Sequence, residues 1–176
     1  MIIEEQTISS DRIYTGKVIS LKVDTVEVPQ KGYQKREIIE HPGAVGIVAI
    51  TSDNKVVLVK QYRKAIEKSI WEIPAGKLEQ GESPKDCAIR ELKEETGYTA
   101  NNIKLIHKFY TSAGFSNQKM YIYLATDLEA GEASLDEGEF LDMYEIDVED
   151  AYEMVNKNEI EDAKTSIGLL LAKELL

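Results

Sequence analysis

The sequence predicts an α/β (α+β) domain in which helices pack against a mixed β-sheet. Three observations support this fold class. Many short apolar or alternating runs are separated by brief turns, which is typical of strands. One capped helix interrupts them in mid-chain, and two further helical patterns follow near the end. A chain of 176 residues is long enough for one such domain to bury a sizeable core.

The strand patterns fill most of the first half of the chain. Residues 11–28 alternate between apolar and polar side chains around a turn at Gly16-Lys17, which predicts a β-hairpin. The apolar run 43–50 predicts a strand that is buried on both faces. Further strands are expected, in chain order, at 34–41, 56–62, 70–73, 103–110, 118–125 and 140–146.

The mid-chain helix has clear signals at both ends. Ser83 can cap the first free N–H groups, Pro84 suits the first helical position, and Gly97 is a natural stop. The helical spacing directs Ile89 and Leu92 towards a core.

Two more helices are expected at 148–156 and 162–176, with Asp162 as the cap of the second. The apolar face of that second helix is predicted to consist of Ile167, Leu170, Leu171 and Leu175.

Composition excludes several classes of function. The net charge of −11, from 32 acidic and 21 basic residues, argues against nucleic-acid or anionic-membrane binding through a basic surface. No window approaches the roughly 18 apolar residues of a membrane span. Cys87 is the only cysteine, so no intramolecular disulfide is expected and a cytoplasmic location is the default. We expect Cys87 to be a small buried residue.

An acidic cluster on the mid-chain helix has the right chemistry for a divalent metal ion. Glu91, Glu94 and Glu95 fall within an arc of about 100° around the helix. From these residues alone, a solvated charged face is the preferred interpretation. Mg²⁺ prefers such oxygen ligands, keeps several waters and shares phosphate oxygens of a substrate.

The spacing around this cluster is specific. It runs Gly76, five residues, Glu82, seven residues, Arg90-Glu91-Leu92, one residue, Glu94-Glu95, one residue, Gly97, Tyr98. This resembles the complete Nudix box of the Nudix hydrolases, which cleave nucleoside diphosphates linked to another group. The resemblance implies that Glu91 and Glu95 are catalytic Mg²⁺ ligands, with Mn²⁺ as an alternative metal. It also implies that Glu94 is a ligand or near neighbour, and that Arg90 holds the carboxylates in place.

The resemblance also sharpens the fold. It implies an α/β/α sandwich with a mixed sheet over residues 43–176, preceded by an N-terminal antiparallel β-extension over residues 1–42. The extension is expected to pack across the interface of a homodimer.

Several stretches outside the box resemble the ADP-ribose pyrophosphatase branch of the family: 35–37, 41–45, 60–63, 71–76 and 162–165. In that branch the arginines matching Arg36 and Arg63 contact substrate, and the glutamate matching Glu72 lies beside the site. The residue matching Ala75 binds a metal through its backbone carbonyl. Without the resemblance, Arg36 is an exposed strand arginine and Arg63 a charge at a strand end.

The loop at 111–118 is expected to contribute to substrate binding through Ser112 and Gly114. It departs from the branch pattern, because Ala113 replaces a marker proline and Gln118 replaces a glutamate. These two departures concern the choice of substrate, and they leave the predicted hydrolytic residues unchanged.

A general base or additional metal ligand is expected from the acidic loop after residue 129. Glu139 matches that position best, Glu137 is the alternative, and a merely solvated loop is the plain interpretation.

These features predict a Mg²⁺-dependent hydrolase that converts ADP-ribose, or a related nucleoside diphosphate sugar, to AMP and ribose 5-phosphate. One alternative is a Nudix hydrolase of another substrate, such as a sugar nucleotide or dinucleoside polyphosphate. A second is a non-catalytic ligand-sensing module, which would have no need for all the box glutamates.

Overall fold

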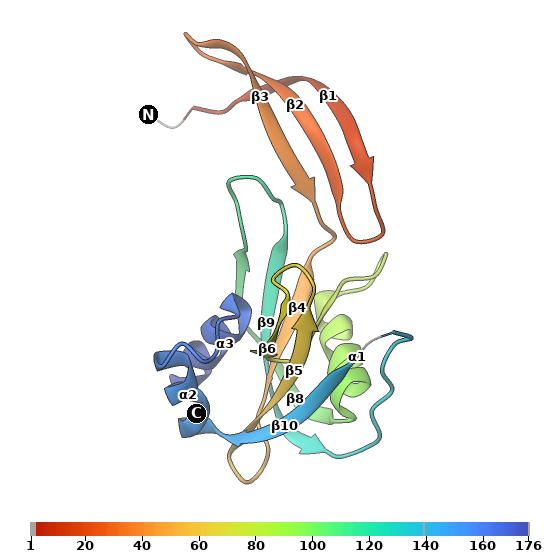
Figure 1. Ribbon diagram of the computed structural model, residues 1–176, viewed down its shortest axis with the longest axis vertical. Helices are drawn as coiled ribbons and strands as arrows, with labels where there is room; N and C mark the ends of the chain where they lie inside the picture. The colour runs from red at the N-terminus through yellow and green to blue at the C-terminus, as the bar shows by residue number, and fades with distance from the viewer. Residues whose placement is uncertain (1–2, 139, 176) are drawn as a thin grey trace. The chain divides into compact units, whose positions relative to one another are not determined.

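The computed structural model describes residues 3–138 and 140–175. The chain forms two compact units, shown in Figure 1. Unit 1 contains the chain up to Gly43 together with Phe109–Lys119, and unit 2 contains Ala44–Lys108 and Met120–Leu176. Each unit has its own secondary structure and is described by itself.

Unit 1 is built on a three-stranded antiparallel sheet. Its strands are β1 (Gln6–Thr15), β2 (Ser20–Val28) and β3 (Gly32–Glu40), paired in that order. The β1–β2 pair confirms the predicted hairpin. The loop that follows β8 joins this unit, because the Ile39 N–H donates to the Phe115 carbonyl at 2.8 Å.

The first sheet of unit 2 is mixed, as predicted. It runs in the order β7-β4-β9-β8, from the strands β4 (Ala44–Ala49), β7 (Ala75–Lys77), β8 (Thr99–Tyr110) and β9 (Lys119–Glu129). Strand β4 pairs in parallel with β9 and antiparallel with β7. Every residue of β4 is buried, which confirms the prediction for the apolar run. The sequence did not predict β7, because three residues are too few to show a strand pattern.

The second sheet of unit 2 is antiparallel in the order β10-β5-β6. It comprises β5 (Lys55–Arg63), β6 (Lys68–Glu72) and β10 (Leu141–Asp147). Strands β5 and β6 are consecutive, and the turn between them places Arg63 opposite Lys68. The chain then leaves β6 at Glu72 and enters β7 at Ala75.

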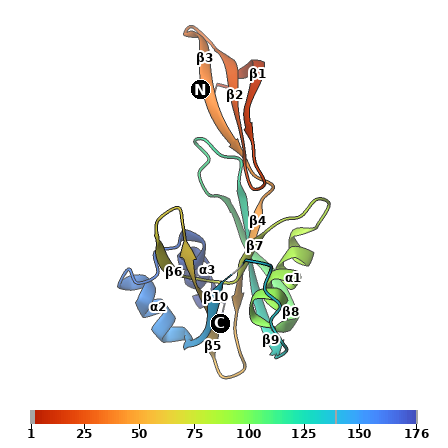
Figure 2. The same cartoon turned by 45° about the vertical axis from the view of Figure 1, so that its right-hand side comes forward.

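Helices cover unit 2 on opposite sides. Helix α1 (Pro84–Thr96) lies on one side of the sheets, and α2 (Val148–Asn156) and α3 (Ala163–Lys173) lie on the other, as Figure 2 shows. This is the predicted α/β/α sandwich with a mixed sheet. Within the described residues, no helix has the length and apolar character needed to cross a membrane.

Two predictions about helix faces were correct only in part: Leu92 of α1 is buried as predicted, and Ile167 and Leu171 of α3 are partly buried. Ile89 is 41% exposed, and the inward face of α1 is formed by Cys87, Ala88 and Leu92. Small residues serve there because α1 packs closely against β4 and β7.

The buried face of α3 also differs from the predicted one. Leu170 and Leu175 are about half exposed, whereas Gly168, Leu169 and Ala172 are buried. A Cβ at Gly168 would lie 2.9 Å from a methyl group of Val48, so this glycine allows the helix to approach β4. A search for large apolar residues overlooks such a contact.

Candidate active site

Helix α1 begins and ends where the sequence predicts. The Ser83 hydroxyl accepts a hydrogen bond from the Asp86 N–H at 3.2 Å, and Pro84 follows at the first helical position. Gly97 closes the helix in the left-handed conformation, with φ of 77°, and its N–H donates to the Lys93 carbonyl. These ends fix the position of the acidic residues along the helix.

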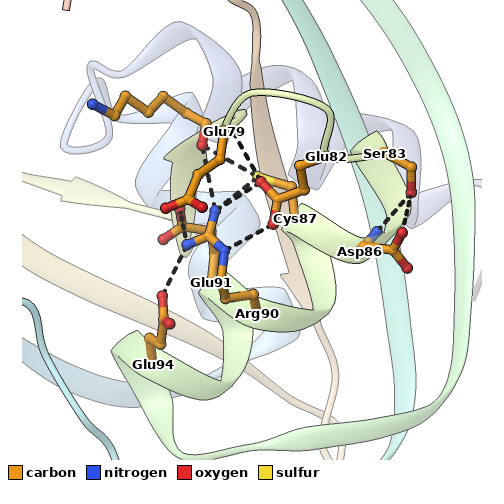
Figure 3. Close-up of polar contacts among 9 residues, drawn as sticks. Glu79, Glu82, Ser83, Asp86, Cys87, Arg90, Glu91 and Glu94 are labelled. Atoms are coloured by element: carbon orange, nitrogen blue, oxygen red, sulfur yellow. Dashed lines mark hydrogen bonds and ion pairs between the residues drawn. The ribbon is translucent and has the colours of Figure 1, made fainter. Parts of the chain in front are cut away.

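Arg90 organises three of the glutamates. Its Nε and Nη2 donate to both oxygens of Glu82 at 2.8 and 3.0 Å. Its Nη1 donates to Glu91 at 2.8 Å and to Glu94 at 2.9 Å. Figure 3 shows the guanidinium lying among the three carboxylates. One cation therefore offsets the repulsion that Glu91 and Glu94 would otherwise have for each other.

The pKa values in this cluster follow from that geometry. The hydrogen bonds from Arg90 lower the pKa of Glu82 to about 2, against an opposing effect of burial. In turn, the hydrogen bonds to Glu82 are the main reason that the pKa of Arg90 is raised. Burial, reinforced by Glu82, raises the pKa of the Cys87 thiol. Cys87 is fully buried, which confirms the prediction for this residue.

Glu95, the fourth carboxylate of the cluster, and Glu91 lie against the start of β7. Glu95 is only 3% exposed, and its Oε2 accepts the Ala75 N–H at 3.1 Å. The carboxylate of Glu91 occupies the space beside Gly76, where a Cβ would lie only 1.8 Å from Oε1. A solvated acidic face is therefore the wrong interpretation for Glu95, and Gly76 is required because a side chain there would displace Glu91.

The chemistry of these donors fits a hard divalent cation. Glu91, Glu94 and Glu95 supply only oxygen, and the Ala75 backbone lies within hydrogen-bond reach of Glu95. Among residues 3–138 and 140–175, no group of three or more His, Cys, Asp or Glu side chains is arranged to hold a metal ion by itself. Mg²⁺ does not need one, since it commonly binds one or two carboxylates and completes its shell with water and phosphate oxygens.

Arg63 and Glu72 form a second cluster in unit 2. Arg63, at the end of β5, donates from Nε and Nη2 to the two oxygens of Glu72 at 2.6 and 2.8 Å. Glu72 is 2% exposed, and Lys164 of α3 also donates to it. Burial acts to raise the pKa of Glu72, but its two cationic partners outweigh that effect and lower the pKa. Glu72, with the neighbouring charge of Glu95, raises the pKa of Arg63.

The remaining predicted substrate residues lie in unit 1. Arg36 on β3 donates from Nε and Nη2 to the carboxylate of Glu5 at 2.8 and 2.5 Å. Ser112 closes the turn of the loop, its carbonyl accepting the N–H groups of Phe115 and Ser116. A cavity of about 470 Å³ within unit 1 is lined by Arg36, Gly114 and the rings of Tyr110 and Phe115 among others.

Two further predictions concern the acidic loop before β10. Glu139 lies outside the described residues. Glu137 is described and exposed.

The sequence did not identify Glu5 or Lys164 as partners of the two arginines. No local sequence pattern marks Glu5 as the partner of Arg36. Lys164 stood in a recognisable run at 162–165, but its partner Glu72 is 92 residues away in the chain.

Comparisons with known proteins agree with this geometry. The model for the NUDIX domain matches residues 40–167. The ADP-ribose pyrophosphatase of Bacillus subtilis (strain 168) is 48% identical over 178 residues, covering 99% of this chain and 96% of the relative. The methanol dehydrogenase activator of Bacillus methanolicus is 47% identical, covering 96% and 92%. A crystal structure of an ADP compounds hydrolase superposes with a TM-score of 0.88 at 23% identity, covering 100% of this chain and 96% of that one. The chain therefore belongs to the Nudix family and is a Nudix hydrolase.

Proposed function

We propose that this enzyme hydrolyses the pyrophosphate of ADP-ribose, or of a related nucleoside diphosphate sugar, to AMP and ribose 5-phosphate. The observation that carries the proposal is the Arg90-ordered glutamate cluster, packed against the strand end at Ala75 and Gly76. The near full-length similarity to the Bacillus subtilis enzyme supports the substrate.

Nudix hydrolases use a divalent metal ion, and we assign Mg²⁺ here, with Mn²⁺ as a substitute. Glu91, Glu94, Glu95 and the Ala75 carbonyl would hold it. Bound there, the metal would polarise phosphoryl oxygens and lower the pKa of a water molecule. Other groups of the chain would hold these ligands in place. Arg90 keeps Glu91 and Glu94 together despite their like charges, and the Ala75 N–H orients Glu95.

Arginine is well suited to the anionic part of the substrate, because its planar fork binds phosphate oxygens in a bidentate way. We assign Arg63 and Arg36 to this part. Glu72 orients Arg63 within unit 2. Ser112 and Gly114, in the loop of unit 1, are assigned to substrate binding as well. Glu139, or Glu137 in its place, would accept the proton of the attacking water or add a metal ligand.

We further propose a cytoplasmic homodimer in which the extension at 1–42 packs across the interface and 43–176 forms the Nudix domain. Exposed apolar side chains on unit 1 support the dimer, since an isolated sheet rarely leaves so many in water. They are Ile8, Ile13, Tyr14, Val18, Ile19 and Tyr33. Sedimentation at micromolar concentration tests this assembly, and a monomer would count against it. The lone, buried Cys87 fits a reducing compartment.

A Nudix hydrolase of another nucleotide is the second candidate for the substrate, because of the loop at 111–118. Gln118 is engaged within that loop, where Thr111 donates to its Oε1 at 3.0 Å. A neutral amide here cannot serve as an anionic ligand or base. The non-catalytic sensing module gains no support, since it would not need a glutamate cluster ordered in this way.

A substrate panel separates these candidates. ADP-ribose, GDP-mannose, diadenosine polyphosphates and free nucleoside diphosphates are incubated with Mg²⁺ or Mn²⁺, and the products are identified by mass. We expect ADP-ribose to give the highest kcat/KM, with AMP and ribose 5-phosphate as products. Absence of ADP-ribose turnover would overturn the proposed substrate, and absence of any turnover would favour the sensing module.

A further inference from the structure

The N-terminal end of α3 carries polar side chains that contact the end of β6, and the chain runs from there to Ala75. Asp162 caps the helix, its Oδ2 accepting the N–H of Thr165 at 2.9 Å and the Thr165 hydroxyl at 2.6 Å. The same oxygen accepts from Lys164 Nζ at 3.0 Å. The cap therefore fixes the positions of both Lys164 and Thr165.

These two side chains reach across to consecutive residues at the end of β6. The Thr165 hydroxyl accepts the Ile73 N–H at 2.9 Å, and Lys164 donates to Oε2 of Glu72. Two residues further on, the Ala75 N–H donates to Glu95. The segment from Glu72 to Ala75 is thus held by α3 on one side and by α1 on the other.

Glu72 transmits the effect of Lys164 to Arg63. Its carboxylate accepts Nε and Nη2 of Arg63 in parallel, a geometry that fixes both the plane and the direction of the guanidinium. Nη1 is the guanidinium nitrogen that this clamp does not use. Arg63 is 43% exposed along its side chain, whereas Lys164 is only 11% exposed, so Arg63 is the member that a ligand can contact.

The charges of this cluster balance only when Lys164 is present. Glu72 and Asp162 carry two negative charges, and Arg63 and Lys164 carry two positive charges. Removing the lysine would leave a net charge of −1 beside a site that must receive an anion. It would also leave the buried Glu72 with one cation in place of two, and the loss of a partner is unfavourable for a buried carboxylate because its charge is then less well compensated.

We propose that Lys164 is a positioning residue for hydrolysis: by holding the buried carboxylate of Glu72, it orients the Arg63 guanidinium towards a phosphate of the substrate. This inference rests on the proposed function, because it takes Arg63 as a substrate-binding residue. Lys164 itself contacts no substrate. Its effect is on how well the enzyme binds the anion, so the ground state and the transition state are stabilised alike.

The test compares three variants of the full-length enzyme. Lys164→Met removes the charge and keeps the length, and Lys164→Arg restores a cation. Lys173→Met is the matched control, because Lys173 lies on the same helix, has a side chain that is about half exposed, and pairs with Glu149 rather than with Glu72. Steady-state kinetics with ADP-ribose and the thermal unfolding midpoint are measured for each. The ¹⁵Nε–¹H resonance of Arg63, assigned with Arg63→Lys, reports the Glu72 clamp without any substrate.

We expect Lys164→Met to raise KM about tenfold, the size of one lost charge-assisted interaction, with kcat changed less than about threefold. The Arg63 Nε resonance should move towards that of a solvated arginine. Lys164→Arg should restore both, and Lys173→Met should change neither. If Lys164→Met does not fold, Lys164→Gln, which keeps a donor but no charge, takes its place.

An unchanged KM and an unchanged Arg63 resonance in the folded Lys164 variant would overturn the proposal. So would an equal effect of Lys173→Met. If the unmodified enzyme does not turn over ADP-ribose, the proposed substrate fails instead, and the Arg63 resonance still decides whether Lys164 orients that side chain.

Discussion

Gly76 allows a quantitative test of how the glutamates are placed. An alanine Cβ at this position would lie 1.8 Å from Oε1 and 1.9 Å from Cδ of Glu91. Real Cβ atoms do not approach other heavy atoms below 3.0 Å, so the carboxylate must retreat by about 1.2 Å. That retreat moves Glu91 from the position in which Arg90 holds it at 2.8 Å.

A misplacement of about 1 Å at a reacting centre can lower the rate about 100-fold, so we expect Gly76→Ala to reduce kcat by about that factor. The fold should survive. The backbone of Gly76 is not left-handed, and replacing such a glycine by alanine restricts the unfolded chain, which contributes about 0.4–1 kcal/mol of stability. This gain partly offsets the cost of moving Glu91.

The assay is ADP-ribose turnover at saturating Mg²⁺, alongside the midpoint of chemical unfolding. Gly16→Ala is the control, because its Cβ also meets a side chain at 2.7 Å, but that side chain is the exposed Tyr14 ring, which can move into solvent. Full turnover by Gly76→Ala would refute the placement of Glu91. A loss of turnover that simply followed unfolding would refute the geometric explanation.

Three further predictions concern single side chains. The pKa of Glu82 is lowered from 4.5 to about 2 by Arg90, so its contribution to stability is complete above pH 4.5 and is lost as the pH falls towards 2. Urea unfolding across that range should show a steeper acid decline in the parent than in Glu82→Gln, and equal slopes would contradict this. The raised pKa and burial of Cys87 predict no reaction with a thiol reagent at pH 8 until the protein unfolds, and rapid labelling of the native state would be the contrary result. Glu5→Gln should weaken the clamp on Arg36 and lower KM for ADP-ribose about two- to fivefold, if Arg36 receives substrate phosphate in place of that carboxylate. An unchanged KM would show that Glu5 and substrate do not compete.

Local sequence spacing predicted where the helices and strands lie better than it predicted which of their side chains are buried. The cap at Ser83 and the stop at Gly97 flank α1 and depend on neighbours a few residues away, so both were predictable. Glu94 and Glu95 fall on one arc by spacing, yet Glu95 is buried while the side chain of Glu94 is a third exposed. That difference depends on which strand the helix covers, and spacing along a helix does not contain it.

The partners of the arginines show the same limit at longer range. Arg63 and Glu72 are nine residues apart on adjacent antiparallel strands, but the register places Arg63 opposite Lys68 and Glu72 opposite Val59, so strand pairing alone does not predict their contact. Lys164 and Glu72 meet only because α3 packs beside β6, 92 residues later in the chain. Gly168 enables a close approach of α3 to the sheet, and a glycine in a helix is ordinarily interpreted as a weak point rather than a contact.

The most direct test of the central claim is hydrolysis of ADP-ribose by the parent enzyme and by Glu95→Gln, measured side by side. The amide keeps the size of the side chain and an oxygen for the Ala75 N–H, but removes the charge that a metal ligand needs. AMP and ribose 5-phosphate are quantified over a Mg²⁺ titration, and the unfolding midpoint is recorded. We predict that the parent forms both products, and that Glu95→Gln forms them at least about 100-fold more slowly while remaining folded. Equal turnover by the two proteins would contradict the assignment of the glutamate cluster as the active site.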